Sequence, residues 1–370
     1  MNTLDLESSV SIPSNNVSKY SINPRPINDE LFAQLIKHAV NKIDKPEEGF
    51  FGPESILWKI MRFNYPWLIG ASRMLTLQSI HIWMTQAGSD FSYGFKYPMK
   101  RAVNTFMMMS QIIFGDKETA LKTAATIRNI HNQIEGKLQS ARHPFPDNHY
   151  QANDANALLW VHATLWETTV LTYELIYSPL KPSEKDKLYE ELVLLGMLFG
   201  IPKDTMPKDW QEFLEYNQAI YDSKILSGEG NSKKMARYFL DELDSTMPKV
   251  FSPFFFFLRE FTISTLPEQI RVKMALNYNS MAAKVFLRAM KIVTKTVFIP
   301  IPYNGLFVQR KAKLSRIKTR KNLADRYWLI MDSTAMSMLR LTTLVFLSRR
   351  KVDDGMSSRQ AIMHLAKRNR

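Results

Sequence analysis

Two histidines in apolar surroundings are the residues of this chain best placed to do chemistry. His131 and His162 lie about thirty residues apart, each in the apolar row of a predicted helix. The rows are Ala120, Ala124, Ile127, His131 and Ile134 in the first helix, and Leu158, Leu159, His162, Leu165, Trp166, Thr169 and Tyr173 in the second. A single histidine in such a row is usually a hydrogen-bonded core residue. Two imidazoles buried without partners would cost roughly 1–3 kcal/mol each, and a shared metal or cofactor would remove that cost.

The residue types around the histidines narrow the choice of ligand. The chain has no cysteine, which excludes disulfides, iron–sulfur clusters, thiolate-ligated haem and cysteine-ligated zinc. Neither row carries an acidic residue beside its histidine, which disfavours zinc and a non-haem iron site with one carboxylate ligand. Haem needs one or two imidazoles, an apolar slot and cations for its propionates. Arg73, Arg101 and Arg128 are candidate cations, although each also suits a solvated surface position.

Local signals predict the helices that carry the two histidines. Asp116 is expected to cap a helix over 117–135 that ends at Gly136. Asp154 is expected to cap a helix over 155–177, which stops before a proline. Long amphipathic stretches dominate the chain and few runs alternate between apolar and polar residues, which predicts an all-α protein. Further helices are predicted at 31–43, 54–62, 66–86, 98–113, 267–292, 322–347 and 357–368.

Length and composition predict a globular, multi-helix bundle. The 370 residues, 45% of them hydrophobic, can bury a large core. Residues 1–30 are polar and are expected to form a mobile N-terminal arm. Residues 31–250 are expected to form the helical domain with both histidines, and residues 251–370 a basic helical region that packs on it. No signal peptide and no uncharged apolar run of about 18 residues is visible. We therefore expect a cytoplasmic protein whose membrane contact, if present, is peripheral.

Positive charge is concentrated in the last hundred residues. Residues 271–370 contain 22 Lys and Arg but only 4 Asp and Glu. Such a region is typical of contact with an anionic membrane surface, of nucleic-acid binding, or simply of solvated helix faces. No helix-turn-helix, zinc-finger or RNP motif accompanies the charge, so nucleic acid is the least favoured of these partners.

Several short motifs resemble one known family of oxygenases. They are Gly70-Ala-Ser-Arg73, Arg101-x-x-x-Thr105, Arg128-x-x-His131, Tyr150-x-Ala-Asn-Asp154 and Leu159-Trp-Val-His162-Ala-Thr-Leu165. Together they resemble the catalytic domain shared by the endoplasmic-reticulum-bound oxygenase of mycophenolic acid synthesis and the rubber oxygenases, or latex-clearing proteins. The resemblance covers about residues 55–220, and its most specific part runs from Tyr150 to Leu165.

The resemblance implies an all-α bundle around a single b-type haem. In this reading His162 is the proximal iron ligand and Arg128 lies near the haem. His131 and Asn132 stand where the rubber enzymes carry Lys and Thr. His131 is therefore expected either to bind iron on the distal side or to stand off it as a hydrogen-bond donor and acid or base. Because of this departure, rubber itself does not carry over as the substrate.

The expected function is a haem b-dependent oxygenase that uses O₂ to oxidise or cleave a double bond in a hydrophobic, prenyl- or lipid-like substrate. The alternative is a non-catalytic bis-histidine haem-binding protein, a carrier or sensor, associated with membranes. A channel for the substrate could draw on Met107–Met109 and Phe251–Phe257, although both segments also suit ordinary core packing.

Overall fold

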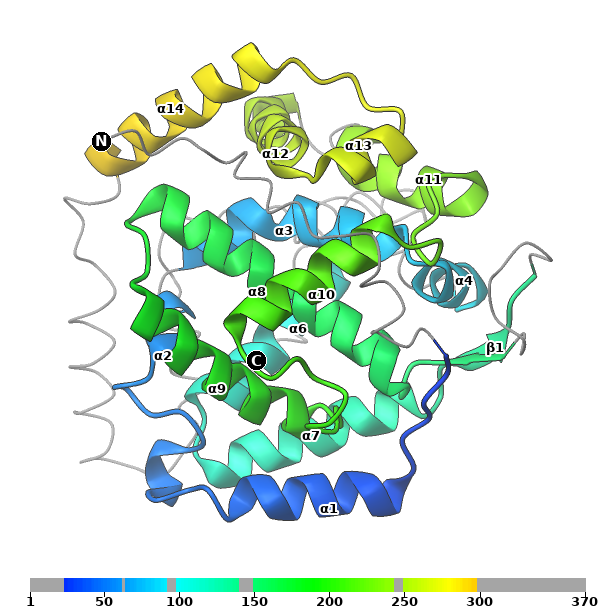
Figure 1. The fold of residues 1–370 in the computed structure, drawn as a ribbon, viewed down its shortest axis with the longest axis vertical. Helices are drawn as coiled ribbons and strands as arrows, with labels where there is room; N and C mark the ends of the chain where they lie inside the picture. The colour runs from blue at the N-terminus through cyan, green and yellow to red at the C-terminus, as the bar shows by residue number, and fades with distance from the viewer. Residues whose placement is uncertain (1–22, 62–63, 92–97, 140–148, 243–248, 298–370) are drawn as a thin grey trace, which may run out of the picture.

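The predicted all-α class is confirmed by the computed structural model (Figure 1), which describes residues 23–61, 64–91, 98–139, 149–242 and 249–297. The helices are α1 (Asp29–Val40), α2 (Ile56–Met61), α3 (Asn64–Ser79), α4 (Ile82–Asp90), α6 (Pro98–Phe114), α7 (Lys117–His131), α8 (Ala155–Ile176), α9 (Pro182–Leu198), α10 (Trp210–Asp222), α11 (Gly230–Arg237), α12 (Ser252–Thr265), α13 (Glu268–Lys273) and α14 (Ser280–Val297). Two short strands, β1 (Glu135–Lys137) and β2 (His149–Gln151), form an antiparallel pair. The helices predicted at 322–347 and 357–368, and most of the N-terminal arm, lie outside the described residues.

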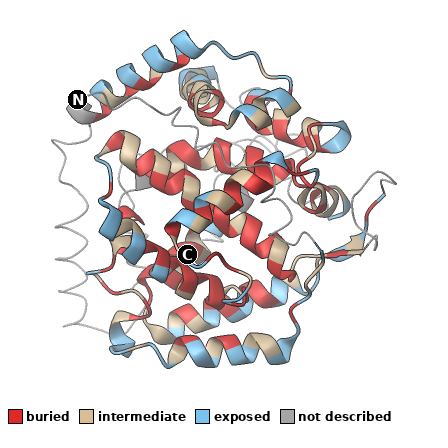
Figure 2. Ribbon diagram, in the orientation of Figure 1, coloured by how far each residue is buried: buried red, intermediate tan, exposed pale blue. Residues whose placement is uncertain are grey.

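Helix α8 is the central element of the fold. Asp154 caps it as predicted, because its carboxylate accepts hydrogen bonds from the backbone N–H groups of Asn156 and Ala157. The helix is buried along most of its length (Figure 2) and packs most extensively against α3. A helix that is apolar on nearly every side needs neighbours all round, and α8 therefore places His162 deep inside the molecule.

Helix α7 begins as predicted but ends earlier. Asp116 caps it by accepting from the Thr119 N–H, whereas the last helical residue is His131 rather than Glu135. The chain then enters β1, where Gly136 faces Tyr150 of β2. A Cβ on Gly136 would lie 2.8 Å from the Tyr150 hydroxyl. The glycine therefore makes room for an aromatic side chain and does not end the helix.

Two helices that the sequence pattern predicts as continuous are each divided. The stretch 66–86 separates into α3 and α4 because His81 caps α4, with its Nδ1 accepting from the Trp83 N–H at 3.3 Å. The stretch 267–292 separates into α13 and α14. Ala275 there adopts a positive φ of 50°, and Asn279 accepts from the Ala282 N–H at the start of α14. The polar side chains of His81 and Asn279 therefore start a second helix inside each of these amphipathic stretches.

The core has one large and one small cluster. The large cluster joins α2, α3, α6, α8, α9 and α10. The small cluster holds Ile69, Ile176, Phe261, Leu287 and Met290, and it joins α12 and α14 to α3 and α8. The C-terminal helices α12 and α14 therefore pack on α3 and α8. Within the described part of the chain, no helix is both long and apolar enough to cross a bilayer.

Candidate functional site

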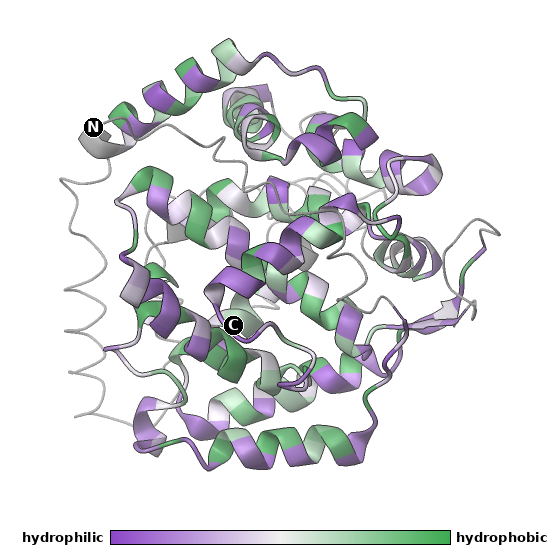
Figure 3. Ribbon diagram, viewed as in Figure 1, coloured by the Kyte–Doolittle hydropathy of each residue, from purple (hydrophilic) through white to green (hydrophobic). Residues whose placement is uncertain are grey.

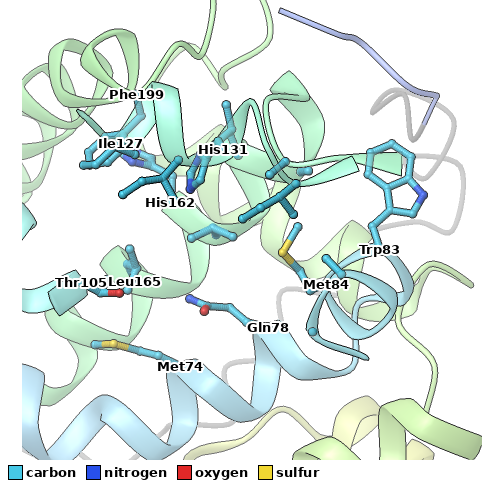
Figure 4. Close-up of a pocket in the computed structure, with 18 of the residues that line it drawn as sticks. Met74, Gln78, Trp83, Met84, Thr105, Ile127, His131, His162, Leu165 and Phe199 are labelled. Carbon is cyan, nitrogen blue, oxygen red and sulfur yellow. The ribbon is translucent and has the colours of Figure 1, made fainter. Parts of the chain in front are cut away.

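A cavity of about 520 Å³ lies between α3, α4, α6, α7 and α8. Its walls are mostly apolar, and its volume falls in the range of small-molecule sites. Both predicted histidines line it. In Figure 4 the His131 and His162 side chains approach the cavity from α7 and α8, and Met74 and Gln78 of α3 lie across it. The other lining residues include Trp67, Leu75, Trp83, Met84, Thr105, Met108, Met109, Ile127, Tyr150, Leu158, Val161, Leu165 and Phe199.

His162 is buried, with 6% of its surface exposed. Burial lowers its pKa to about 3, against a smaller opposing effect of a hydrogen bond with the Leu192 backbone. The imidazole is therefore neutral at physiological pH, which is the form that binds metal ions. Its Nδ1 accepts a hydrogen bond of 3.2 Å from the indole N–H of Trp166, one turn later in α8. Because Nδ1 accepts, the ring proton of the neutral imidazole lies on Nε2. Metal binding through Nε2 would require that proton to move to Nδ1 and the Trp166 N–H to turn away from it.

His131 is half-buried at the end of α7 and separates the large cavity from a second, polar one. The second cavity has a volume of about 270 Å³. Its lining consists of Asn28, Asp29, Arg128, His131, Asn132, Ile134, Glu135, Gln151 and Asn153. Ile134, Gln151 and His131 line both cavities, so an apolar chamber and a polar chamber meet at His131.

Arg128 is the buried cation of the polar cavity. Its Nε and Nη2 donate to the Asp29 carboxylate at 3.2 and 3.0 Å, and Nη2 also donates to the Ile27 carbonyl. The guanidinium carbon lies 5.2 Å from the centre of the Phe32 ring. Nη1, by contrast, is buried without a hydrogen-bond partner among the described residues, as is Oδ1 of Asn153. A buried guanidinium N–H with spare donor capacity is well suited to bind a carboxylate.

The other two predicted cations are placed differently. Arg73 lines neither cavity; its Nη1 donates to Glu167 at 2.8 Å and to Thr168 at 2.5 Å, and its Nε donates to the Thr265 carbonyl at 3.2 Å. Tyr221 donates to the same Glu167 carboxylate at 2.6 Å. Arg73 thus joins α3, α8, α10 and the end of α12. Arg101 belongs to α6, but its side chain lies outside the described residues.

Some lining residues carry little sequence signal. Gln78 is half-buried in the cavity wall, and its Nε2 donates to the Thr164 hydroxyl at 3.0 Å. A glutamine on a predicted helix is more often a surface residue, so only the three-dimensional packing identifies it. Of the proposed channel segments, Met108 and Met109 line the cavity, whereas no residue of Phe251–Phe257 is among the described lining residues.

The donor set fits a haem better than a bare metal ion. Among the described residues, no group of three or more histidine, aspartate or glutamate side chains gathers as a metal site would require. Haem supplies four iron ligands from its own ring and needs only one or two imidazoles from the protein. A neutral, buried His162 in an apolar cavity, with the spare N–H of Arg128 in the adjoining polar cavity, meets that need.

His81 is a second buried histidine, and it is expected to make the protein acid-labile. Burial lowers its pKa to about 3 from the ordinary 6.5. Stability that depends on its neutral form is complete above pH 6.5 and is lost as the pH falls toward 3. At pH 5 the loss is about 2 kcal/mol. Urea unfolding at pH 7 and pH 5 measures it in wild type and in His81→Asn, which keeps a capping oxygen without a titrating ring. Equal losses in both proteins would contradict the expectation.

The fold and the site define the class of protein: an all-α helical bundle with two histidines on one apolar cavity. The chain belongs to the family described as the catalytic domain of the ER-bound oxygenase mpaB/B' and rubber oxygenase, which matches residues 58–295, more than half of the sequence. The predicted family is thereby confirmed, and its description as an oxygenase catalytic domain agrees with the predicted oxidoreductase class. The match extends beyond the predicted 55–220 and takes in α12 and most of α14.

Curated relatives add similarity without a described activity. Two uncharacterized proteins, one from Mycobacterium tuberculosis and one from Mycobacterium bovis, are each 28% identical to the chain over 127 residues. The aligned segment covers 34% of this chain and 48% of each relative. The chain therefore spans about half the length of the curated relatives it matches. No solved structure matches the chain.

Proposed function

We propose that the protein is a haem b-dependent oxygenase that uses O₂ to oxidise or cleave a carbon–carbon double bond in a hydrophobic, prenyl- or lipid-like substrate. The observation that carries the proposal is that His131 and His162, from different helices, line one apolar cavity. The cavity walls suit an apolar chain, and the family is one of oxygenases. When bound, haem iron supplies the activation of O₂ that the protein's own side chains lack.

Each residue of the site has a distinct part in this proposal. His162 holds the cofactor through its neutral imidazole, since burial keeps it unprotonated. Arg128 binds a cofactor carboxylate through the Nη1 that has no partner among the described residues, and Asp29 keeps the guanidinium in place. His131, at the junction of the two cavities, holds or delivers a proton on the substrate side. The apolar walls exclude water from the reacting atoms.

The same pair of histidines also suits a second function, that of a haem carrier or sensor. If both imidazoles bound one haem permanently, no open position would remain for O₂, and the protein would be a bis-histidine carrier or sensor. The two functions differ in whether a small gas can bind to the reduced protein. That difference decides between them without knowledge of the natural substrate.

The test is an isotope experiment on the purified full chain with bound haem. The protein is reduced without oxygen and exposed to ¹⁸O₂ with a long prenyl alcohol or an unsaturated fatty acid, and products are analysed by mass spectrometry. We expect ¹⁸O in carbonyl or hydroxyl products, and a shift of the optical spectrum with CO. A reduced protein that binds neither CO nor O₂ and yields no labelled product would overturn the oxygenase proposal and favour the carrier. The variant His131→Ala tests whether this residue transfers a proton or binds the iron permanently. Loss of turnover with CO binding as in wild type would indicate proton transfer.

A further inference from the structure

Helix α14 has two apolar faces, one turned toward the core and one turned away from it. Its inward residues Ala283, Leu287 and Met290 are buried, and the last two belong to the small core cluster. On the side away from the core, Met281, Val285 and Ile292 are 72%, 57% and 65% exposed. Figures 1 and 2 show α14 at the edge of the molecule, with its outer surface coloured as exposed. An ordinary surface helix has one apolar face, so the outer one calls for a separate explanation.

Cations form a row of their own on α14. Lys284, Arg288 and Lys291 follow one another at steps of four and three residues, the spacing of neighbours along one side of a helix. This row lies beside the outer apolar row, and α14 contains no aspartate or glutamate. Figure 3 shows the alternation of hydrophilic and hydrophobic residues along α14. A solvated helix face usually mixes charges of both signs, whereas this one offers a single sign next to exposed aliphatic side chains.

The sign of the charge selects the partner. Residues 298–370 carry 16 Lys and Arg against 4 Asp and Glu, so neither this segment nor a second copy of α14 complements the cationic row. An anionic partner does. Nucleic acid would pair with the cations but would leave the outer aliphatic side chains in water. An anionic bilayer accepts both, because headgroups bind the cations while the acyl boundary takes up the apolar side chains.

We propose that α14 docks the protein on an anionic phospholipid surface, lying in the plane of the interface. Met281, Val285 and Ile292 enter the acyl boundary, and Lys284, Arg288 and Lys291 contact the lipid phosphates and carboxylates. The helix lies on the bilayer and does not cross it, in keeping with the hydropathy of the described helices. This inference goes beyond the proposed oxygenase activity and does not depend on it, since the outer face of α14 lines neither cavity.

The test is flotation of the full chain with vesicles of phosphatidylcholine that contain about one third phosphatidylserine. Wild type is expected to float with these vesicles, to float much less with phosphatidylcholine alone, and to detach in high salt. The double variant Val285→Ser with Ile292→Ser keeps every charge and is expected to weaken binding about tenfold or more. Neutralising Lys284, Arg288 and Lys291 to Gln is expected to weaken it by about fivefold per charge.

Leu214→Ser is the matched control, because Leu214 is an exposed leucine of α10, away from α14. It is expected to float like wild type. The proposal is overturned if wild type ignores anionic vesicles, or if the α14 variants float as well as wild type. It is also overturned if the Val285/Ile292 variant binds vesicles normally while the charge variant loses binding both to vesicles and to duplex DNA. That pattern would identify a general polyanion site. Haem content, measured in the same samples, is expected to be unchanged in every variant.

Discussion

His162→Ala is expected to abolish stoichiometric haem binding by the purified protein. The proposed iron ligand is the buried, neutral His162 imidazole on the central helix α8, and alanine would leave the iron without a bond from that side. Loss of an outer-sphere partner of a metal ligand typically costs about 10- to 100-fold in affinity, and loss of the ligand itself is expected to exceed this. Optical titration with haem, followed by the Soret band, measures the change. Added imidazole, which can enter the vacated space, is expected to restore part of the spectrum.

Two variants serve as comparisons for this experiment. His81→Asn also removes a buried histidine, but one that lines neither cavity, and it is expected to bind haem like wild type. His131→Ala is expected to retain haem, since His131 holds a proton rather than the cofactor in the proposed function. Wild-type affinity in His162→Ala would show that the cofactor is held elsewhere, and equal losses in His162→Ala and His81→Asn would indicate a general effect on folding.

Arg73→Met is expected to lower the free energy of unfolding by about 3–5 kcal/mol. The substitution leaves Glu167, whose side chain is 19% exposed, without its ionic partner. It also removes the hydrogen bonds to Thr168 and to the Thr265 carbonyl that tie α3 to α8 and to the end of α12. Breaking one side of a buried pair costs more than the pair contributes, because the remaining charge stays desolvated. Chemical denaturation of wild type and variant under the same conditions measures the difference.

The partner variant separates a structural role for Arg73 from a cofactor role. Arg73→Met combined with Glu167→Leu removes both charges, and it is expected to recover part of the lost stability. The folded fraction of Arg73→Met is expected to bind haem with wild-type affinity, since Arg73 lines neither cavity. Weakened haem binding at unchanged stability would instead support the cofactor role that the sequence pattern predicts for this residue.

The elements that carry the site were predictable from the sequence because their signals are local. Asp116 and Asp154 cap α7 and α8 through backbone groups two or three residues away, a pattern that short-range sequence encodes. The helical period that directs His162 inward is likewise a property of one segment. The family motifs predicted an oxygenase with haem in its helical core, and the match to an oxygenase family supports the oxygenase part of that prediction.

What the sequence could not show depends on contacts between distant segments. Arg73 meets Glu167 nearly a hundred positions along the chain, so its pairing has no local signature. The polar cavity exists because Asn28 and Asp29 fold back over Arg128. A glycine often follows the last residue of a helix, but the role of Gly136 is set by Tyr150 on the paired strand. In each case tertiary packing decides among locally equivalent choices.

The central claim is that one haem binds in the cavity beside His162, and titration of the purified wild-type chain with haem tests it most directly. The account predicts a Soret band that grows linearly and stops at one equivalent, with the spectrum of a histidine-ligated b-type haem. Absorbance that rises without a break, at the position and intensity of free haem, would contradict it.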